Sequence, residues 1–420
     1  MERQRLNLAE LENKLVEAAQ IQDRFDLETT NLIAPASPTN PKYINIPLKH
    51  ADIAEGLLGS RPYAGAEGFN RVESIACEVA CNLFGAEHVN VQPHSVSQAN
   101  QAVYQALLND GDNVLAMRFD VGGHLTHGMK KNFSGRFFNF DFYGVDRNGL
   151  LDYEAIAKQT AEFKPKMIVC GASSYPRAID FEKLGKIAKD NGAYLMADLS
   201  HPAGLIIGEK FPAPFPHCDV VTLTPDKTML GPHGGIILTK EKYKELIDKA
   251  VHPGVQSSIP LRRIYEMAIC LIESSKPWFY DLMGRIVDNT KAFEQVFSKH
   301  FDMMVTGGSD THLMVLNTLN TLGLTGKEAE TLLEDNLGVL TNRQVVPNET
   351  QKPYVASGIR LGTTWITARG YSTIEASRVA EIILNNLENP SDTELQKSSK
   401  DELTALTKIY RKEDVWNGEV

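Results

Sequence analysis

Along most of the chain, segments with the hydrophobic pattern of β-strands alternate with segments that have the pattern of α-helices. Short apolar runs predict buried strands, and the segments between them carry apolar residues at helical spacing. The expected strands are His88–Gln92, Asn113–Met117, Met167–Gly171, Ala193–Asp198, Asp219–Thr224 and Gly235–Thr239. The expected helices are Arg71–Phe84, Gln98–Leu108, Tyr153–Phe163 and Phe181–Asn191. Strands that alternate with helices predict an α/β fold with a mostly parallel sheet covered on both faces.

The pattern changes in the last third of the chain. Two long helices are expected at Leu261–Glu273 and Trp278–His300, and a smaller α+β unit follows them. Its expected elements are strands at His312–Asn317 and Gly358–Gly362 and helices at Lys327–Asn336, Ser372–Leu387 and Lys400–Tyr410.

The beginning of the chain differs again. Residues 6–30 predict an amphipathic helix, and residues 31–70 are rich in proline and glycine, which is typical of a functional or wrapping segment. The predicted organisation is an N-terminal arm and wrapping segment at 1–70, a large domain at 71–280 and a small C-terminal domain at 281–420.

Composition narrows the class of protein. The 420 residues are 42% hydrophobic and 23% charged, as in ordinary globular proteins. A net charge of −10 argues against partners such as nucleic acid or anionic membranes. The chain shows no apolar run of membrane-spanning length and no secretory signal, so we expect a cytoplasmic protein. Cys77 and Cys81 share a helix face, but no further metal ligands are evident nearby, which favours core packing over a metal site.

Ligands of such sheets bind outside the carboxyl ends of the strands, so polar residues there are the candidates for chemistry. Ser95 and Ser97 stand at a helix start, where they either cap the helix or bind a phosphate. His124 and His127 are three residues apart. A metal pair is conceivable, but no matching acid lies near them in sequence, and a histidine that stacks on a planar ring is favoured.

Two neighbouring strands each lead to a charged residue. Asp198 ends an apolar strand, where a carboxylate needs a cationic partner or serves as a helix cap. Lys227 follows the next strand in a glycine-rich turn. It is either a solvated turn lysine or a desolvated nucleophile. Pyridoxal phosphate needs a lysine for its aldehyde and an acid for its ring nitrogen, and these residues with the serines and His124 supply both.

Five motifs carry a resemblance to a known family: Asn90–Ser95, Gly122–Gly128, Asn132–Gly135, Lys164–Ile168 and Ser357–Thr363. Over roughly residues 30–390 the chain resembles the serine hydroxymethyltransferases, fold-type I pyridoxal-phosphate transferases of the aspartate aminotransferase-like architecture. The resemblance implies at least a homodimer, and dimer and tetramer both stay open.

The resemblance also implies roles for individual residues. Lys227 would bind the cofactor covalently, Asp198 would pair with its ring nitrogen, His124 would stack on the ring, and Arg360 would bind the amino-acid carboxylate. Glu55 would be the acid/base of the transfer, from a segment that reaches the neighbouring subunit. The further residues expected around cofactor and substrate are Tyr63, Ser95, Val96, Ser97, Ser173, His201, Thr224 and Ser258, the last contributed by the other subunit with Gln256 and Ser257.

Several positions depart from the family pattern. The residues before Lys227 are Pro225-Asp226 instead of threonine-histidine, and a carboxylate there would raise the pKa of the lysine. The N-terminal motif has Pro35-Ala36 instead of serine-glutamate. The other departures are Ile53, Pro62, Phe119, Gln344 and the Ser257-Ser258 pair.

The expected activity is therefore to make or break the Cα–Cβ bond of a β-hydroxy amino acid. The resemblance implies conversion of serine to glycine with tetrahydrofolate as co-substrate. The changed positions on the folate and carboxylate sides leave open a folate-independent aldolase or transaldolase, or other chemistry at Cα. A non-catalytic paralogue is the third hypothesis, and it predicts no covalent link between Lys227 and the cofactor.

Overall fold

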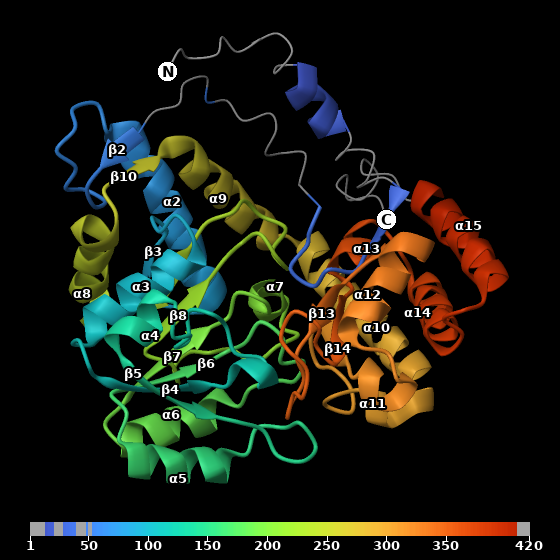
Figure 1. The fold of residues 1–420 in the computed structure, drawn as a ribbon. Helices are drawn as coiled ribbons and strands as arrows, with labels where there is room; N and C mark the ends of the chain where they lie inside the picture. Colours follow the sequence, from blue (N-terminus) through green and yellow to red (C-terminus); the bar gives the residue numbers. More distant parts are fainter. Residues whose placement is uncertain (1–12, 21–27, 39–47, 49–52, 410–420) are drawn as a thin grey trace, which may run out of the picture.

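A seven-stranded sheet forms the centre of the computed structural model, which describes residues 13–20, 28–38, 48 and 53–409 (Figure 1). The strand order is β3-β9-β8-β7-β6-β4-β5. Its strands are β3 (His88–Asn90), β4 (Asn113–Met117), β5 (Asn139–Tyr143), β6 (Met167–Cys170), β7 (Tyr194–Asp198), β8 (Val220–Leu223) and β9 (Ile236–Thr239). Strands β8, β7, β6, β4 and β5 pair in parallel, and only β9 runs antiparallel to its neighbours β3 and β8. The predicted mostly parallel sheet is confirmed.

Helices cover both faces of this sheet because successive side chains of each strand point to opposite sides. On β4, Leu115 and Met117 join one hydrophobic cluster, while Val114 and Ala116 join the other. The first cluster includes residues of α2 (Glu67–Phe84), α5 (Tyr153–Phe163), α6 (Phe181–Asp190), α7 (Ala203–Ile207) and α9 (Leu261–Ser274). The second includes residues of α3 (Val96–Leu107) and α8 (Lys244–Lys249), with Phe133 of α4 (Phe133–Phe137) packed against it.

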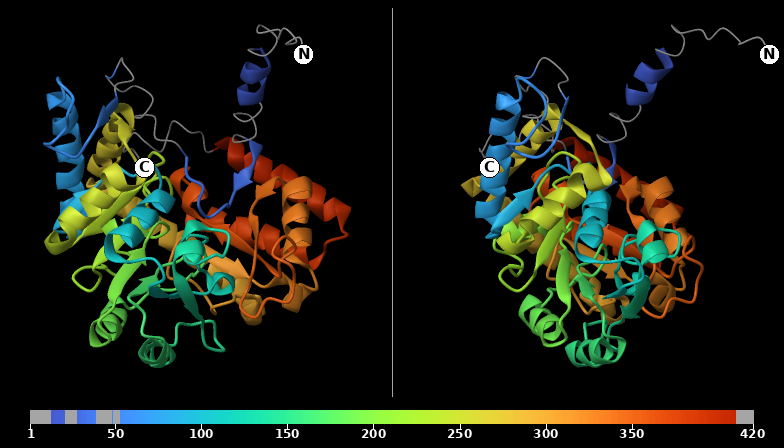
Figure 2. Two further views of the ribbon diagram at one scale, coloured as in Figure 1. Left: turned by 60° about the vertical axis from the view of Figure 1, so that its left-hand side comes forward. Right: turned by 90° about the vertical axis from the view of Figure 1, so that its left-hand side faces the viewer.

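A smaller antiparallel sheet, with strand order β11-β14-β13, forms the second unit beside the large one (Figure 2). Its strands are β11 (Leu313–Leu316), β13 (Asn342–Gln344) and β14 (Gly358–Gly362). Its helices are α10 (Pro277–Phe297), α11 (Thr318–Leu322), α12 (Gly326–Thr331), α13 (Thr364–Ala368), α14 (Thr373–Glu388) and α15 (Thr393–Ile409).

The N-terminal segment returns to this second unit. Strand β1 (Thr30–Asn31) pairs in parallel with β12 (Val339–Leu340). Leu32 then packs, fully buried, into the hydrophobic cluster of α10, α14 and the small sheet. Residues 28–38 are therefore held against the small unit, and the boundaries 1–70, 71–280 and 281–420 stay a prediction.

Most expected elements appear within one or two residues of their predicted ends, and β4, α5 and β14 have the predicted bounds. Helix α2 begins at Glu67, earlier than Arg71, and α15 begins at Thr393, earlier than Lys400. The helix expected at Lys327–Asn336 divides into α12 and a π-helical turn at Leu332–Leu337. Strand β5 was not predicted, because it lies at the sheet edge and most of its side chains are partly exposed.

Of the amphipathic helix expected at residues 6–30, the structure describes residues 13–20 as helical, and 1–12 and 21–27 lie outside the described residues. Leu15 and Val16 on this helix are exposed. None of the helices in the described ranges combines the length and the apolar character that crossing a membrane requires.

Candidate active site

Predicted site residues meet where the carboxyl ends of the central strands face the small unit. Asp198 is the last residue of β7, Lys227 follows β8, His124 follows β4 and Arg360 lies on β14. Their charges act on one another: the Lys227 amine responds to Asp198 and Arg360, and the His124 ring responds to Lys227 and Asp198. Segments that are far apart in sequence thus form one cluster at the sheet edge.

Asp198 is buried and stays ionised. Its Oδ2 accepts hydrogen bonds from Asn100 Nδ2 at 2.9 Å and His127 Nε2 at 3.2 Å, and its Oδ1 accepts from Ser200 N and Oγ. Burial alone would raise the pKa of this carboxyl. The hydrogen bond from His127, the nearby His124 ring and the hydrogen bonds from Ser200 outweigh burial and hold the pKa far below its usual range. An ionised carboxylate in such a place can hold a cationic ring nitrogen.

Asn100 and His127 both donate to Asp198, and neither of them was assigned a role from the sequence. Asn100 lies on α3 and is buried, and its Oδ1 accepts from Thr222 Oγ1 at 2.6 Å. Thr222 therefore orients the amide so that its Nδ2 faces Asp198. A buried polar residue on a helix face is the only signal that could have indicated Asn100, while His127 was visible in the glycine-rich motif.

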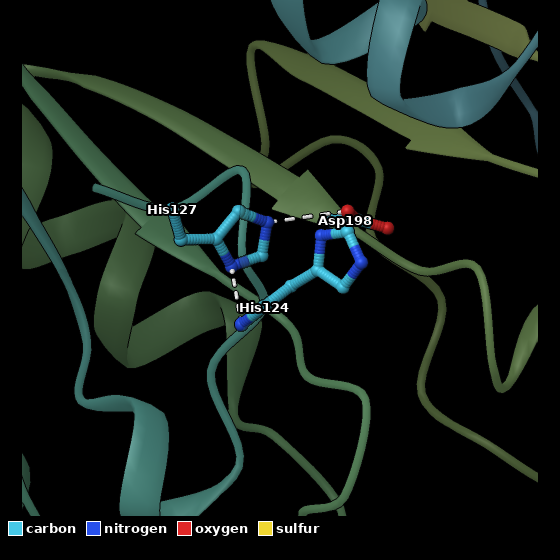
Figure 3. Close-up of side chains that lie close together, drawn as sticks. All are labelled: His124, His127 and Asp198. Atoms are coloured by element: carbon cyan, nitrogen blue, oxygen red, sulfur yellow. Dashed lines mark hydrogen bonds and ion pairs between the residues drawn. The ribbon is translucent and has the colours of Figure 1, made fainter. Parts of the chain in front are cut away.

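The two histidines and Asp198 lie close together, with their ligand atoms within 4.8 Å of one another (Figure 3). His127 Nδ1 accepts a hydrogen bond from the backbone N of His124 at 3.4 Å, which leaves Nε2–H to donate to Asp198. His124 Nδ1 lies 2.8 Å from Thr126 Oγ1, and burial lowers the pKa of His124 to about 4. At neutral pH this ring is therefore uncharged. Since both ring nitrogens of His127 are already used in hydrogen bonds to the protein, the group suits a planar cationic ring better than a metal ion.

Lys227 lies in the turn that follows β8 and is partly buried, as a desolvated nucleophile requires. Burial lowers the pKa of the Lys227 amine, and the positive charge of Arg360 lowers it further. The negative charges of Asp198 and Asp226 raise this pKa, but they do not cancel the lowering. Within the described residues, no hydrogen bond or ion pair holds the Lys227 amine. Thr224 donates to Asp226 Oδ1 at 2.5 Å, and its expected contact with the cofactor stays a prediction.

The serines expected at the phosphate stand at the start of α3. Ser95 is the N-cap, and its Oγ accepts from the backbone N of Gln98 at 3.2 Å. Val96 and Ser97 begin the first turn, where backbone N–H groups lack helical partners. The capping and the anion-binding interpretations are thus compatible, since the cap leaves the other N–H groups of that turn available.

Gly235 lies close to this phosphate loop. A Cβ there would come within 2.5 Å of the Ser95 carbonyl oxygen, so glycine is required for β9 to start beside the loop.

Arg360 is held from two sides. Its Nη1 donates to the Ser173 carbonyl at 2.5 Å, and its Nε donates to Asn342 Oδ1 at 3.0 Å. Nη2 makes no hydrogen bond to any of the described residues. Ser173 Oγ in turn donates to the carbonyls of Gly122 and Gly123, just before His124. The loop after β6 therefore connects the guanidinium to the histidine segment and leaves one side of the fork available.

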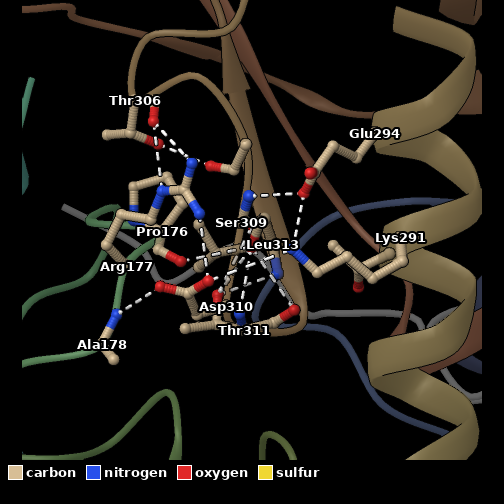
Figure 4. Close-up of polar contacts among 12 residues, drawn as sticks. Pro176, Arg177, Ala178, Lys291, Glu294, Thr306, Ser309, Asp310, Thr311 and Leu313 are labelled. Carbon is tan, nitrogen blue, oxygen red and sulfur yellow. Dashed lines mark hydrogen bonds and ion pairs between the residues drawn. The ribbon is translucent and has the colours of Figure 1, made fainter. Parts of the chain in front are cut away.

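The same loop is fastened to the small unit a few residues later (Figure 4). Arg177 donates to the Thr306 carbonyl and forms an ion pair with Asp310 at 3.0 Å. The second oxygen of Asp310 accepts from the backbone N of Ala178 at 3.1 Å, and Lys291 of α10 lies 4.0 Å from this carboxylate. These contacts fix the position of the loop that carries Ser173.

His201 was expected beside the cofactor ring, and it has an unpredicted neighbour. Its Nδ1 lies 3.2 Å from His312 Nε2, and the two rings are stacked with centroids 5.4 Å apart. Burial lowers the pKa of both rings, that of His312 to about 3, with further lowering by Lys227 and Arg360. Two neutral imidazoles therefore border the lysine.

Glu55, Tyr63 and Ser258 form a separate group. Glu55 lies on β2 (Ile53–Glu55), which pairs with β10 (Ser258–Pro260), so that Glu55 is directly opposite Ser258. Tyr63 OH donates to Glu55 Oε2 at 3.3 Å, and His252 Nε2 lies 3.7 Å from Glu55 Oε1. None of the hydrogen bonds or ion pairs among the described residues connects this group to Lys227.

The group is anchored to the body of the protein by a buried polar network. Arg61 forms an ion pair with Glu73 of α2 and lies 4.9 Å from the centre of the Phe69 ring. Gln92 donates to the other Glu73 oxygen at 2.8 Å and to the Gly56 carbonyl. The strand with Glu55 is thus fixed in place against the large unit.

Two of the positions that depart from the family pattern are exposed: Ile53 is 62% and Phe119 45% accessible. Gln344 lies at the end of β13, where its Nε2 donates to the Val345 carbonyl. Ser37, the residue after Pro35-Ala36, donates from Oγ to the Asp226 carbonyl at 3.0 Å. The residue that follows the changed N-terminal motif is therefore hydrogen-bonded to the changed turn before Lys227.

The comparisons with known proteins cover most of the chain. A family model described as serine hydroxymethyltransferase matches residues 21–383. A curated protein from Mycoplasma mycoides subsp. mycoides SC, described as serine hydroxymethyltransferase, is 45% identical over 358 residues. This alignment covers 85% of the chain and 86% of the relative.

Proposed function

The chain belongs to the serine hydroxymethyltransferase family, whose members are pyridoxal-phosphate-dependent transferases, and from this membership we propose that it interconverts serine and glycine with tetrahydrofolate as the one-carbon acceptor. The observation that carries the proposal is the cluster of Lys227, Asp198, His124 and Arg360 at the carboxyl ends of the strands. It contains a desolvated amine, an ionised acid, a neutral ring and a carboxylate-binding fork.

The donor set of this cluster fits pyridoxal 5'-phosphate. Asp198 would hold the protonated ring nitrogen, and the neutral ring of His124 would lie against the face of the cofactor. The first turn of α3, from Ser95 to Ser97, would hold the phosphate. Bound there, the cofactor would supply an electron-withdrawing ring conjugated to the amino acid.

The protein's own groups would orient the substrate and move its protons. Arg360 would bind the substrate carboxylate through the side of its fork that has no protein partner, while Ser173 and Asn342 hold the other side. Lys227 would bind the aldehyde of the cofactor through its neutral amine. The position of the lysine favours this neutral form, because desolvation lowers the pKa of the amine.

Glu55 would be the acid/base for the hydroxymethyl group, with Tyr63 as its hydrogen-bond partner. Because no hydrogen bond or ion pair among the described residues joins this pair to Lys227, we propose that Glu55, Tyr63 and Ser258 complete the site of a neighbouring copy. The family supports an oligomer in general, and a homodimer is the smallest assembly in which each site receives this group.

Glycine formation by the purified protein with pyridoxal phosphate, serine and tetrahydrofolate tests the proposal. Lys227→Arg keeps the charge but is expected to abolish both the turnover and the visible absorbance of lysine-bound cofactor. Lys240→Arg is the matched control, because Lys240 pairs with Asp219 at 3.1 Å at the other end of the sheet and is expected to change neither.

The result that would overturn the proposal is lysine-bound cofactor without glycine formation. Cleavage of a β-hydroxy amino acid in the absence of folate would then identify an aldolase. Absence of the lysine-bound cofactor in the unchanged protein would identify a non-catalytic relative.

A further inference from the structure

Arg263, near the start of α9, holds two consecutive backbone carbonyls of the loop that leads into α3. Its Nη1 donates to the Pro93 carbonyl at 2.9 Å, and its Nη2 donates to the Gln92 carbonyl at 2.6 Å. Pro93 comes two residues before Ser95, the N-cap of α3. The guanidinium therefore holds the chain directly before the turn whose free backbone N–H groups can bind an anion.

The same two carbonyls each accept a second hydrogen bond. The Gln92 carbonyl accepts from Gln256 Nε2 at 2.9 Å, and the Pro93 carbonyl accepts from the backbone N of Gly235 at 2.9 Å. A carbonyl oxygen has two lone pairs, so both oxygens are fully used. Without the Arg263 side chain each carbonyl would still keep one donor. We therefore expect the loop to fold in such a variant, but to be held less firmly.

The positive charge of Arg263 is not neutralised within the part of the chain that the structure describes. No carboxylate there pairs with the guanidinium, and its buried Nε has no hydrogen-bond partner among the same residues. Glu73, which Gln92 connects to this loop, already forms an ion pair with Arg61. Burial lowers the pKa of Arg263 to about 10, so the side chain keeps its charge at neutral pH. A desolvated cation without an acidic partner indicates that an anion binds near it.

His94 shows that this charge acts on the loop itself. Burial lowers the pKa of the His94 ring, and the positive charge of Arg263 lowers it further. The ring Nε2 lies 3.0 Å from the carbonyl oxygen of Ser258 on β10, the strand that directly precedes α9. The loop is thus connected both to α9 and to β10, and Arg263 supplies the positive charge on this side.

We propose that Arg263 is a positioning residue for the phosphate group of the cofactor. By holding the carbonyls of Gln92 and Pro93, it sets the first turn of α3 so that the backbone N–H groups face a phosphate monoester, and its charge balances the bound anion. This inference rests on the proposed function only in taking that turn as the place of the phosphate. Lys227 and Asp198 would hold the ring and aldehyde of the cofactor, so Arg263 should affect the phosphate part of binding alone.

The experiment compares pyridoxal phosphate with pyridoxal, which has the same ring and aldehyde but no phosphate. The affinity of the full chain for each compound is measured from the visible absorbance of the lysine-bound form. The ratio of the two affinities isolates the contribution of the phosphate. In a second measurement, inorganic phosphate is added to the cofactor-free full chain, and the midpoint of thermal unfolding is followed.

The variants separate the charge of Arg263 from its geometry. Arg263→Met removes the charge and the donors but keeps an unbranched side chain, whereas Arg263→Lys keeps the charge and loses the planar fork. Arg262→Met is the matched control. Arg262 is the adjacent arginine on α9, its side chain is 51% exposed, and it pairs with Glu266 at 2.9 Å.

Arg263→Met is expected to lower the ratio of affinities about tenfold, because two charge-assisted hydrogen bonds to the loop are lost. Its affinity for pyridoxal should change less than about twofold, since the ring and aldehyde are held elsewhere. Arg263→Lys should lower the ratio by about two- to fivefold, because one ammonium cannot hold both carbonyls in the same geometry. Inorganic phosphate should raise the unfolding midpoint of the unchanged protein and of Arg262→Met, and should raise it less in Arg263→Met.

An unchanged ratio in Arg263→Met would overturn the inference. An equal loss of affinity for both compounds would also overturn it, because that result identifies a general support of the fold. If urea unfolding shows that Arg263→Met is not folded, Arg263→Lys decides, and an unchanged ratio in that variant contradicts the inference. A failure of the proposed function has a different signature: the unchanged protein then forms no lysine-bound species with either compound. In that case the effect of inorganic phosphate on the unfolding midpoints decides the role of Arg263.

Discussion

Replacement of Arg360 by lysine tests how the protein would recognise the substrate carboxylate. The arginine uses Nη1 for the Ser173 carbonyl and Nε for Asn342, and it offers Nη2 to a ligand. A lysine keeps the charge but has one donor atom, which cannot serve the loop and the substrate in the same geometry. We therefore expect Arg360→Lys to lose about one charge-assisted hydrogen bond, worth about 1.5–3 kcal/mol. That corresponds to a roughly 10- to 150-fold weaker affinity for the amino acid.

The measurement is an absorbance titration of the holoenzyme with glycine, together with the KM for serine in steady-state assays. Asn342→Ala is the matched comparison, because it removes only the neutral support of Nε and should weaken binding by about 0.5–1.5 kcal/mol. Unchanged glycine affinity in Arg360→Lys would refute the assigned role of Arg360. A larger effect of Asn342→Ala than of Arg360→Lys would show that the support, and not the fork, determines binding.

Three further predictions concern Asp198, the close approach of Gly171 to Asp198, and the ion pair between Arg378 and Glu402. Asp198→Asn should weaken retention of the cofactor more than tenfold in dialysis, because the ring nitrogen loses its anionic partner. Gly171→Ala should lower the free energy of unfolding in urea by about 2–4 kcal/mol, since Gly171 has φ +93° and a Cβ there would lie 2.0 Å from the Asp198 carbonyl oxygen. Arg378 of α14 donates to both oxygens of Glu402 and lowers its pKa, so this stabilisation is present above about pH 5 and is lost as the pH falls through the folded-state pKa. Glu402→Gln should therefore cost less than about 1 kcal/mol in urea unfolding at pH 7, and the difference should shrink at acidic pH.

The central sheet and its strand ends could be predicted because buried strands leave a strong local signal. Each strand from β4 to β9, apart from β5, is a mostly apolar run, and Asp198 and Lys227 stand out at or just after the ends of two of these runs. Since parallel strands end at the same edge, the meeting of the two residues follows from topology alone. The sequence did not need to show any contact between them.

The contacts that complete the site leave no such signal. Asn100 reaches Asp198 across 98 positions of sequence, and Arg360 reaches the Ser173 carbonyl across 187. A backbone carbonyl as partner has no residue preference that a pattern could reveal. The two-residue strands β1 and β12 are likewise too short for any period to be recognised. Such features depend on how the two units pack together, and only the folded structure contains that information.

The segment that carries the changed N-terminal motif is hydrogen-bonded to the changed turn before Lys227. Ser37, which follows Pro35-Ala36, donates to the Asp226 carbonyl, and the Asp226 side chain is in turn fully hydrogen-bonded by Thr224 and His233. In a site that decays by unrelated substitutions, new polar side chains would lack hydrogen-bond partners. The hydrogen bonds to Asp198 would also be lost as readily as the turn around Asp226 is changed. Here the new carboxylate is satisfied, and every donor to Asp198 is present. The altered turn therefore fits a working site in which the surroundings of the lysine have been changed while the support of the acid has been kept.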